Sequence, residues 1–216
     1  MSVSVTQLIA PGSDTGGTTS THTTASVAPA AGSIIMLTIW HGANETPNTP
    51  TSPGLTLAIG WTQLGATQYN TSWFFGESLW YCKVASGSGT ISWDTASGSQ
   101  DSWTVDQVTG FDTGSTFGAP QGNQGTNSLT LGTFRDANSI GYGAWGGISL
   151  GGNIALGTGF SGVDQYYWSG EAASITTEYK VNTTAITTTT AGGHLCGIAV
   201  EIKAAAVASK PMFRGH

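Results

Sequence analysis

Short apolar runs separated by turn residues extend over the whole chain, and no segment of three helical turns carries an apolar stripe. The runs are rich in Val, Ile, Thr and aromatic residues and are bounded by Gly, Ser and Thr, which is typical of strands joined by turns. The sequence therefore predicts an all-β protein with strands at Val3–Ile9, Ser33–Trp40, Leu55–Leu64, Glu77–Ala85, Gly89–Trp93, Trp103–Thr109, Ser128–Phe134, Ser139–Trp145, Ile154–Phe160, Ala173–Val181, Ala185–Thr190 and Leu195–Lys203.

A faint internal repeat indicates how these strands are organised. Several segments recur with a spacing of roughly 100 residues, which exceeds the 20–50 residues of solenoid repeats. Two halves of one sandwich fit this spacing, because each half alone would expose an apolar sheet face. Chance similarity within a low-complexity β sequence is the alternative. The matching segments are Ser33–Trp40 with Ser139–Trp145, Ile59–Thr62 with Thr158–Ser161, and Tyr81–Val84 with Glu178–Val181.

We therefore expect an antiparallel two-sheet sandwich with a jelly-roll-like topology. Its domain spans residues 27–203, with halves at roughly 27–112 and 126–203. Residues 1–26 form an N-terminal arm, and residues 204–216 form a C-terminal tail.

The charge content narrows the classes of partner. Only 8% of the residues are charged, with six Lys and Arg against twelve Asp and Glu, and the net charge is -6. Such a chain lacks the basic stripe that neutralises successive phosphates or grips anionic lipid, so we expect neither a nucleic-acid nor a membrane partner. The apolar run Ile34–Trp40 is far shorter than the roughly 20 residues of a membrane helix. Because Met1–Val5 does not look like a secretory leader, we expect synthesis in a reducing cytoplasm.

The cysteines and histidines carry no recognisable chemistry. Cys82 and Cys196 show no metal-ligand spacing, and the strand register points both inward as small buried side chains. A disulfide between them is open but unsupported. The three histidines His22, His41 and His194 stand in unlike contexts, so we expect turn or strand-edge residues and no bound metal.

Four glycines at positions 141, 143, 146 and 147 lie in one predicted strand. They indicate bulges or close backbone approach rather than a nucleotide-binding loop. The sequence therefore predicts no cofactor.

Two Asp-Thr-Gly motifs, at Asp112 and Asp14, spell the signature of aspartic proteases. Those enzymes need two carboxylates that share one proton, each on a tight turn after a hydrophobic strand. Gly110 interrupts the strand before Asp112, and Pro11–Ser13 before Asp14 is not strand-like. A protease is therefore a remote alternative, and we expect no enzyme.

Aromatic residues in loop-like segments support a second alternative. Trp73, Tyr167 and Trp168 could stack on sugar rings, which would make the chain a carbohydrate-binding or adhesion module. Against this, a sandwich core of this size needs large apolar side chains.

The last residues combine basic and apolar side chains. Lys210 and Arg214 flank Met212 and Phe213 in an otherwise acidic chain, which favours anchoring on an acidic or apolar partner surface. An incidental tail that packs on its own domain is equally compatible with the sequence.

A set of short segments resembles a known pattern. Leu79–Lys83, Gly89–Trp93, Val105–Asp112 and the closing Gly197–Ala204 are similar to a β-sandwich pattern of tailed-phage virion proteins and bacterial surface proteins, over about residues 25–203. The resemblance implies a jelly-roll-like sandwich on a particle, with no catalytic residues. We therefore expect a non-enzymatic minor capsid or decoration protein on the virion surface. It would bind the major capsid protein or other virion subunits, as a homo-oligomer.

Overall fold

The computed structural model describes residues 2–14, 21–43, 45–95, 100–148, 150–170, 172–190 and 194–206. All the regular secondary structure in this part of the chain is β-strand, which confirms the all-β prediction. The strands are β1 Ser4–Ser13, β2 Thr21–Thr23, β3 Ile34–His41, β4 Leu55–Gln63, β5 Gln68–Asn70, β6 Phe75–Gly87, β7 Ser92–Asp94, β8 Asp101–Thr109, β9 Gln121–Gln124, β10 Ser128–Thr130, β11 Ile140–Ile148, β12 Ser161–Trp168, β13 Ala173–Val181, β14 Ala185–Thr187 and β15 His194–Ile202. The described residues contain no helix long and apolar enough to span a membrane.

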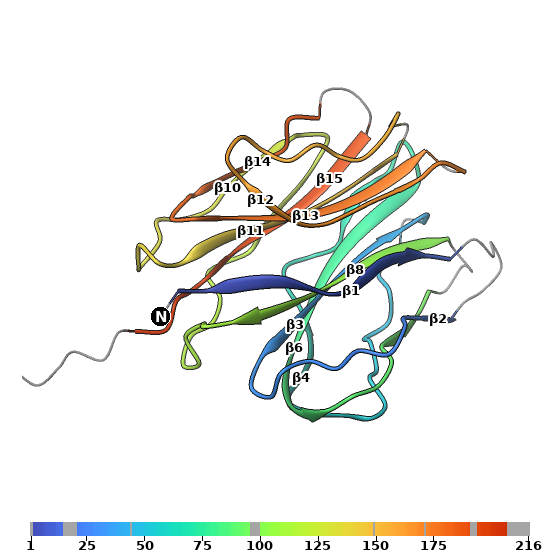
Figure 1. Ribbon diagram of the computed structural model, residues 1–216. Helices are drawn as coiled ribbons and strands as arrows, with labels where there is room; N and C mark the ends of the chain where they lie inside the picture. Colours follow the sequence, from blue (N-terminus) through green and yellow to red (C-terminus); the bar gives the residue numbers. More distant parts are fainter. Residues whose placement is uncertain are drawn as a thin grey trace, which may run out of the picture.

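Two antiparallel sheets pack face to face, so the predicted two-sheet sandwich is confirmed (Figure 1). Sheet A has the order β1-β8-β3-β6-β4, with β5 also pairing to β6. Sheet E has the order β12-β13-β11-β15-β9. Two short ladders, β2-β7 and β10-β14, complete the described strands. The jelly-roll expectation stays a prediction.

The two sheets have the same topology. If β1, β2, β3, β6, β7 and β8 are matched in turn with β9, β10, β11, β13, β14 and β15, the strand orders of the sheets and ladders coincide. Strands β4 and β5 both pair with β6 in sheet A, and the single strand β12 pairs with β13, the counterpart of β6, in sheet E. Together β4 and β5 therefore correspond to β12. The repeat therefore begins with β1, so the segment expected as an arm contributes β1 and β2 to the sandwich.

The pairing registers show which positions correspond. Ile34 on β3 pairs with Lys83 and Val108, and Ile140 on β11 pairs with Val181 and Ile202. Counting along β6 and β13 from these pairs, Tyr81 corresponds to Tyr179. The sequence comparison had placed Glu178 opposite Tyr81, one residue out of register. The match of Ile59–Thr62 with Thr158–Ser161 is in the correct register, because Thr62 pairs with Tyr81 as Ser161 pairs with Tyr179.

Both faces of each sheet are covered, which explains why β3 is buried at every position. Between the sheets, side chains such as Met36, Leu79, Tyr142 and Val200 form one core. On the outer face of sheet A, a second core lies beneath the β2-β7 ladder. On the outer face of sheet E, a third core lies beneath the β10-β14 ladder. The alternation of side chains along a strand sends neighbours such as Ile35 and Met36 into different cores.

The glycines of β11 allow close approach of the outer layer. A Cβ atom on Gly143 would lie 2.5 Å from Ile186 Cγ2 of the β10-β14 ladder, and one on Gly141 would lie 2.7 Å from the backbone oxygen of Thr183. Real Cβ atoms essentially never lie this close to another heavy atom, so a side chain at either position would force its neighbours to shift. The close-approach interpretation of these glycines therefore agrees with the structure.

One predicted strand is wrong. Residues 154–160 are not a strand; the edge strand β12 follows them at Ser161–Trp168, where the sequence predicted an aromatic loop. Ile154 instead inserts into the outer core of sheet E, and its carbonyl oxygen accepts hydrogen bonds from Gln165 and Thr176. A turn closed by the hydrogen bond from Phe160 N to Gly157 O then leads into β12. Apolar residues here cover a sheet rather than extend it.

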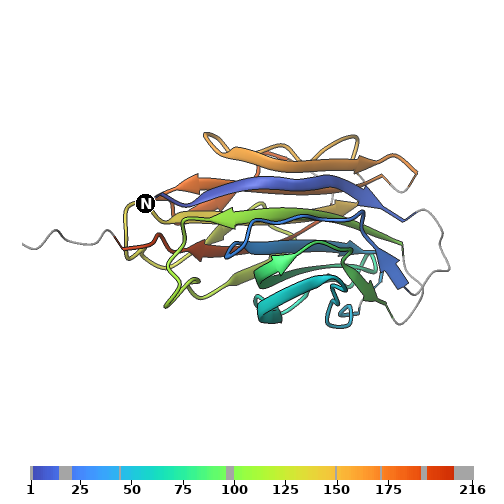
Figure 2. The same ribbon diagram turned by 60° about the horizontal axis from the view of Figure 1, so that its bottom comes forward.

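The strands run along the long axis of the molecule, so the sandwich has two distinct ends (Figure 2). At the terminal end lie Val3, Lys83, Thr109 and Ala204, with the N-terminus and the last described residues side by side. At the hairpin end lie the turns that follow Asn70 in sheet A and Trp168 in sheet E. Contacts across the sheets agree, because Ser13 Oγ lies 2.8 Å from Tyr166 Oη at the hairpin end.

Candidate functional sites at the two ends

Basic side chains gather at the terminal end. Lys83 lies in the last row of the β3-β6 pairing, Lys180 lies in the second-last row of the β11-β13 pairing, and Lys203 directly follows β15. Arg135 lies in the loop before β11 and lines the same pocket as Lys203. These are all the basic residues in the part of the chain that the structure describes.

Acidic side chains dominate the hairpin end. Asp14, Glu45, Asp94 and Asp101 lie in or beside the segments that reach this end, and no described Lys or Arg accompanies them there. The molecule therefore carries a charge gradient along its strands, which the overall charge of -6 conceals. The cations are thus confined to the terminal end, where they lie beside carboxylates, and the hairpin end carries carboxylates alone among the described Lys, Arg, Asp and Glu residues.

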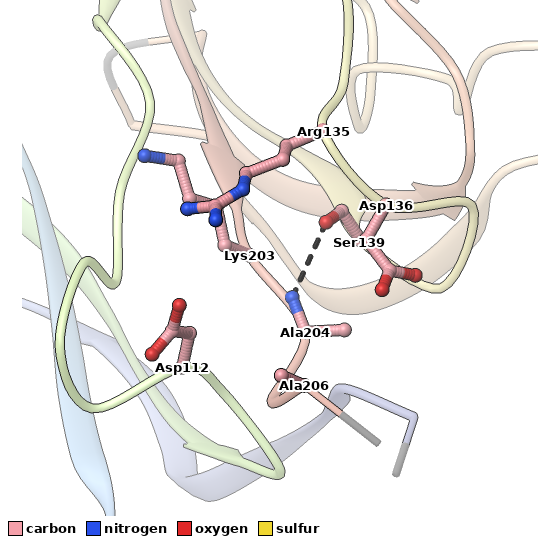
Figure 3. Close-up of a pocket in the computed structure, with 7 residues that line it drawn as sticks. All are labelled: Asp112, Arg135, Asp136, Ser139, Lys203, Ala204 and Ala206. Carbon is pink, nitrogen blue, oxygen red and sulfur yellow. Dashed lines mark hydrogen bonds between the residues drawn. The ribbon is translucent and has the colours of Figure 1, made fainter. Parts of the chain in front are cut away.

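A small pocket of about 110 Å³ opens at the terminal end (Figure 3). Its lining combines two cations with two carboxylates, and residues close to the end of the described chain form one wall. The lining residues are Asp112, Arg135, Asp136, Ser139, Lys203, Ala204 and Ala206.

The two Asp-Thr-Gly motifs are separated by the length of the sandwich. Asp112 is at the terminal end, where Gly114 N donates to Asp112 Oδ1 at 2.9 Å. Asp14 follows β1 at the hairpin end, where its backbone N donates to Asp101 O. Strand β1 spans ten residues, or about 30 Å. These two carboxyls therefore cannot share a proton in the manner of an aspartic-protease dyad.

An aromatic tip projects from the hairpin end between β5 and β6. Trp73 and Phe74 are 45% and 69% exposed. One face of Trp73 stacks on the imidazole of His194, with ring centroids 4.2 Å apart and planes inclined by 26°. We call Trp73 and Phe74 the aromatic tip. It offers apolar surface that the core does not use.

The backbone of the tip is strained. Phe74 has φ = 53°, in the left-handed region where a side chain costs roughly 1–2 kcal/mol. Ala172, at the corresponding place in the hairpin of sheet E, has φ = 50°. The turn shape thus belongs to the repeat, whereas a bulky aromatic residue at this strained position is particular to the first half.

The other two predicted sugar-stacking residues do not join this tip. Tyr167 and Trp168 are half-buried neighbours on β12, so their side chains leave opposite faces of sheet E. Tyr167 packs in the outer core and donates to Leu150 O at 3.0 Å. Trp168 is separated from His194 by strands β13 and β11, a lateral distance of about 14 Å. The three aromatics therefore form no common platform.

Near the hairpin end, a buried polar cluster surrounds His22, which we had expected at a turn or strand edge. His22 Nδ1 lies 3.2 Å from Asp14 Oδ2, and its Nε2 lies 3.1 Å from Thr95 Oγ1. Its ring stacks on Trp93, whose Nε1 donates to Asp101 Oδ2 at 2.7 Å. The cluster ties the β2-β7 ladder to the start of β8. Only the pairing of distant segments brings these residues together, so no sequence spacing could have revealed them.

A hydroxyl-lined hollow of about 240 Å³ lies beside this cluster. Asp94 Oδ1 accepts a hydrogen bond from Thr21 Oγ1 in its lining. The hollow is shallow, and Trp93 in its lining is buried, so it offers no exposed ring for stacking. Its lining residues are Thr21, Thr49, Thr51, Ser92, Trp93 and Asp94.

A pair of carboxyls lies between the two sheets. Tyr142 Oη donates to Asp106 Oδ2 at 2.6 Å, and the Asp164 carboxyl faces that of Asp106 from the other sheet. Burial raises the pKa of Asp106 to about 6. Burial and the neighbouring Asp106 raise the pKa of Asp164 to about 9. Because two adjacent carboxylates repel, one proton is retained between them at neutral pH.

Burial shifts the pKa of other titratable groups toward the neutral form. Burial raises the pKa of Glu77 well above its usual range, and it lowers the pKa of His41 to about 4. Cys82 and Cys196 are buried free thiols in different cores, with no disulfide between them. Burial raises the pKa of Cys82 to about 12, and it also raises that of Cys196.

The predicted anchoring residues Lys210, Met212, Phe213 and Arg214 lie outside the described residues. The described chain ends at Ala206 in the wall of the terminal-end pocket. Among the described residues, no group of three His, Cys, Asp or Glu side chains is arranged to hold a metal ion.

Comparisons with protein-family models, with curated proteins and with solved structures found no match. The functional argument therefore rests on the geometry and charge of the two ends.

Proposed function

We propose that this chain is a non-enzymatic structural protein of a virus particle, which attaches to the assembled shell through its terminal end. The observation that carries the proposal is the charge gradient along the sandwich. All four described basic residues lie at the terminal end, and the tail with Lys210 and Arg214 continues the chain from there.

An acidic protein that presents its few cations on one face is suited to an acidic partner surface, because complementary charge orients the encounter. Only 8% of the residues are charged, so the remaining polar surface consists largely of the hydroxyls of Thr and Ser and the amides of Asn. Low surface charge disfavours a freely dissolved existence at high concentration, and it is tolerable in a subunit held within an assembly. A homo-oligomer on the shell is part of this proposal.

Sedimentation with particles that lack the protein tests the attachment. We expect the full chain to pellet with such particles and to be released as salt rises, since screening weakens exposed charge pairs. Deletion of residues 207–216 combined with Lys83→Gln and Lys180→Gln should abolish pelleting. The matched control is Trp73→Ala at the hairpin end, which should pellet like the unmodified chain. Full binding by the terminal-end variant would refute the proposal.

The aromatic tip supports a second candidate function, a carbohydrate-binding or adhesion module. The free face of Trp73 is held in place by the His194 stack, and a rigid exposed ring is suited to stacking on a neutral sugar. Glycan-array binding that disappears in Trp73→Ala and persists in Trp168→Ala would favour this function. Equal loss in both variants, or no binding by the unmodified chain, would remove it.

A further inference from the structure

The terminal-end pocket contains more hydrogen-bond donors than its own residues use. Lys203 Nζ donates to Ser115 Oγ at 2.9 Å and has two further protons. Arg135 uses its backbone N–H, which approaches Glu201 Oε1 at 3.4 Å, while its guanidinium forms no hydrogen bond or ion pair with any residue that the structure describes. Figure 3 shows both side chains reaching the same side of the pocket.

The acidic residues of the pocket are already engaged in their own turns. Asp112 Oδ1 accepts from Gly114 N at 2.9 Å. Asp136 Oδ1 accepts from both the backbone N and the side-chain Nδ2 of Asn138, at 2.7 and 2.9 Å. The unused hydrogen-bonding capacity on the basic side of the pocket therefore consists of donors, and its complement is an anion.

The backbone around the pocket is held in place by three separate segments. Lys203 N donates to Thr116 O, and Lys203 O accepts from Asp112 N, each at 2.8 Å. Ala204 N donates to the buried Ser139 Oγ at 3.2 Å (Figure 3). A ligand would therefore meet a largely preformed site, which lowers the entropic cost of binding.

Size and local charge select the class of anion. A volume of about 110 Å³ admits a carboxylate-sized group. A guanidinium offers paired N–H donors that match the two oxygens of a carboxylate. The nearby carboxylates of Asp112 and Asp136 penalise a second negative charge, so a monoanion is favoured over a phosphate dianion.

We infer that this pocket binds one carboxylate group of another polypeptide, either an acidic side chain or a C-terminal carboxylate, through Arg135 and Lys203. That this polypeptide belongs to a particle rests on the proposed function. The preference for a carboxylate rests on the pocket alone.

Titration of the full chain, followed by the backbone amide signals of Gly114, Ser139 and Ala204 in NMR spectra, tests the site. N-acetylglycine represents a chain terminus, and the α-amide of N-acetylaspartate represents an acidic side chain. We expect saturable shifts with at least one of them and none with acetamide. The probe that saturates first identifies the source of the carboxylate.

Variants separate binding from folding. Arg135→Gln should weaken carboxylate binding about tenfold, the cost of losing a charge-assisted pair. Arg135→Lys should weaken it less, because it keeps the charge and loses the paired donors. Lys180→Gln is the control, since Lys180 lies at the same end but outside the pocket, with its Nζ bound to Thr158 O. Unchanged dispersion of the remaining signals would show that each variant is folded.

Shifts that do not saturate, or that are equal in Arg135→Gln and Lys180→Gln, would overturn the inference. Tighter binding of inorganic phosphate than of either carboxylate would overturn the ligand class. Particle attachment without carboxylate binding would refute the pocket and leave the proposed function standing. Carboxylate binding without particle attachment would support the pocket and refute the proposed function.

Discussion

The two halves of the sandwich share one topology and fill it in opposite ways. On the outer face of sheet A, the strand corresponding to β11 carries the large side chains Ile35 and Leu37. At the same positions β11 carries Gly141 and Gly143, and Trp145 and Ile186 occupy the space instead. Equivalent layers therefore need a conserved total volume, and which strand supplies it is free to change.

The same comparison separates what the fold needs from what it does not. His22 and Trp93 pair across the β2-β7 ladder where Leu129 and Ile186 pair across the β10-β14 ladder. The aromatic tip stands where the second half has Ala172. Since one half forms without these groups, they are the places where the chain departs from a common scaffold.

Exchanging a residue for its counterpart in a packed layer should have the largest effect. Gly143→Leu copies Leu37 into the second half. The Cβ atom that this substitution adds would lie only 2.5 Å from Ile186 Cγ2. We expect a loss of about 3 kcal/mol or more in the free energy of unfolding, or no soluble protein. Urea unfolding measures this. The control Gly60→Ala, with nothing within 4 Å of the added Cβ, should change stability little; equal losses in both would contradict the volume argument.

The carboxyl pair between the sheets is a second asymmetry, because Asp106 corresponds to Val200. A carboxyl whose pKa is raised by folding binds its proton more tightly in the folded state. Its contribution to stability is complete below pH 4 and is lost as pH rises through its folded pKa. With folded pKa values raised to about 6 for Asp106 and about 9 for Asp164, stability should fall as pH rises from about 4 toward 9.

His41 acts in the opposite direction. Its pKa is lowered to about 4, so its stabilising contribution is complete above its usual value of 6.5 and is lost as pH falls through 4. Between pH 4 and 6 the two carboxyls outweigh the single histidine, so stability should be greatest near pH 4. Urea midpoints across this range test both slopes. Asp164→Asn should flatten the alkaline fall, whereas the exposed control Asp94→Asn should not; an identical fall in Asp164→Asn would show that this pair is not its cause.

Relief of strain at the aromatic tip should have a smaller effect of opposite sign. Phe74→Gly should stabilise the protein by about 1 kcal/mol, because glycine adopts φ = 53° without penalty and the lost side chain is 69% exposed. Thermal unfolding reports the change. Phe74→Ala keeps the strain and should gain nothing. A destabilised Phe74→Gly would mean that the ring packs in solution.

The thiols should show no effect at all in the folded protein. Cys82 and Cys196 correspond to Lys180 and Ser102, so neither has a cysteine counterpart. Their burial and raised pKa values keep them as unreactive thiols. A thiol reagent at pH 8 should label neither until urea unfolds the chain, and then both. Labelling of the native protein at a rate independent of unfolding would contradict this.

Local patterns predicted most of the strands and the existence of the repeat, because strand runs and turn residues are properties of neighbouring positions. They did not predict β12. Its aromatic residues and the apolar segment before it are both compatible with a strand, and the two segments differ only in which surface they cover. The one-residue error between Tyr81 and Tyr179 has a similar origin. Register depends on hydrogen bonds to β3 and β11, which similarity between short segments does not encode.

The functional residues divide in the same way. Trp73 was found because an aromatic side chain in a turn is visible in the sequence, although its stacking on His194 was not. Arg135 with Lys203, and Asp106 with Asp164, were missed because each pair joins residues that are far apart in the chain. Single charged residues in a polar sequence do not indicate which of them will lie close together in the fold.

The two β-hairpins that follow Asn70 and Trp168 leave equivalent positions of the repeat at the same end, opposite the start of β1 and the end of β15 (Figure 2). Peptides grafted into both turns would be presented in parallel from one rigid base. The repeat thus makes this small protein a natural scaffold for bivalent display.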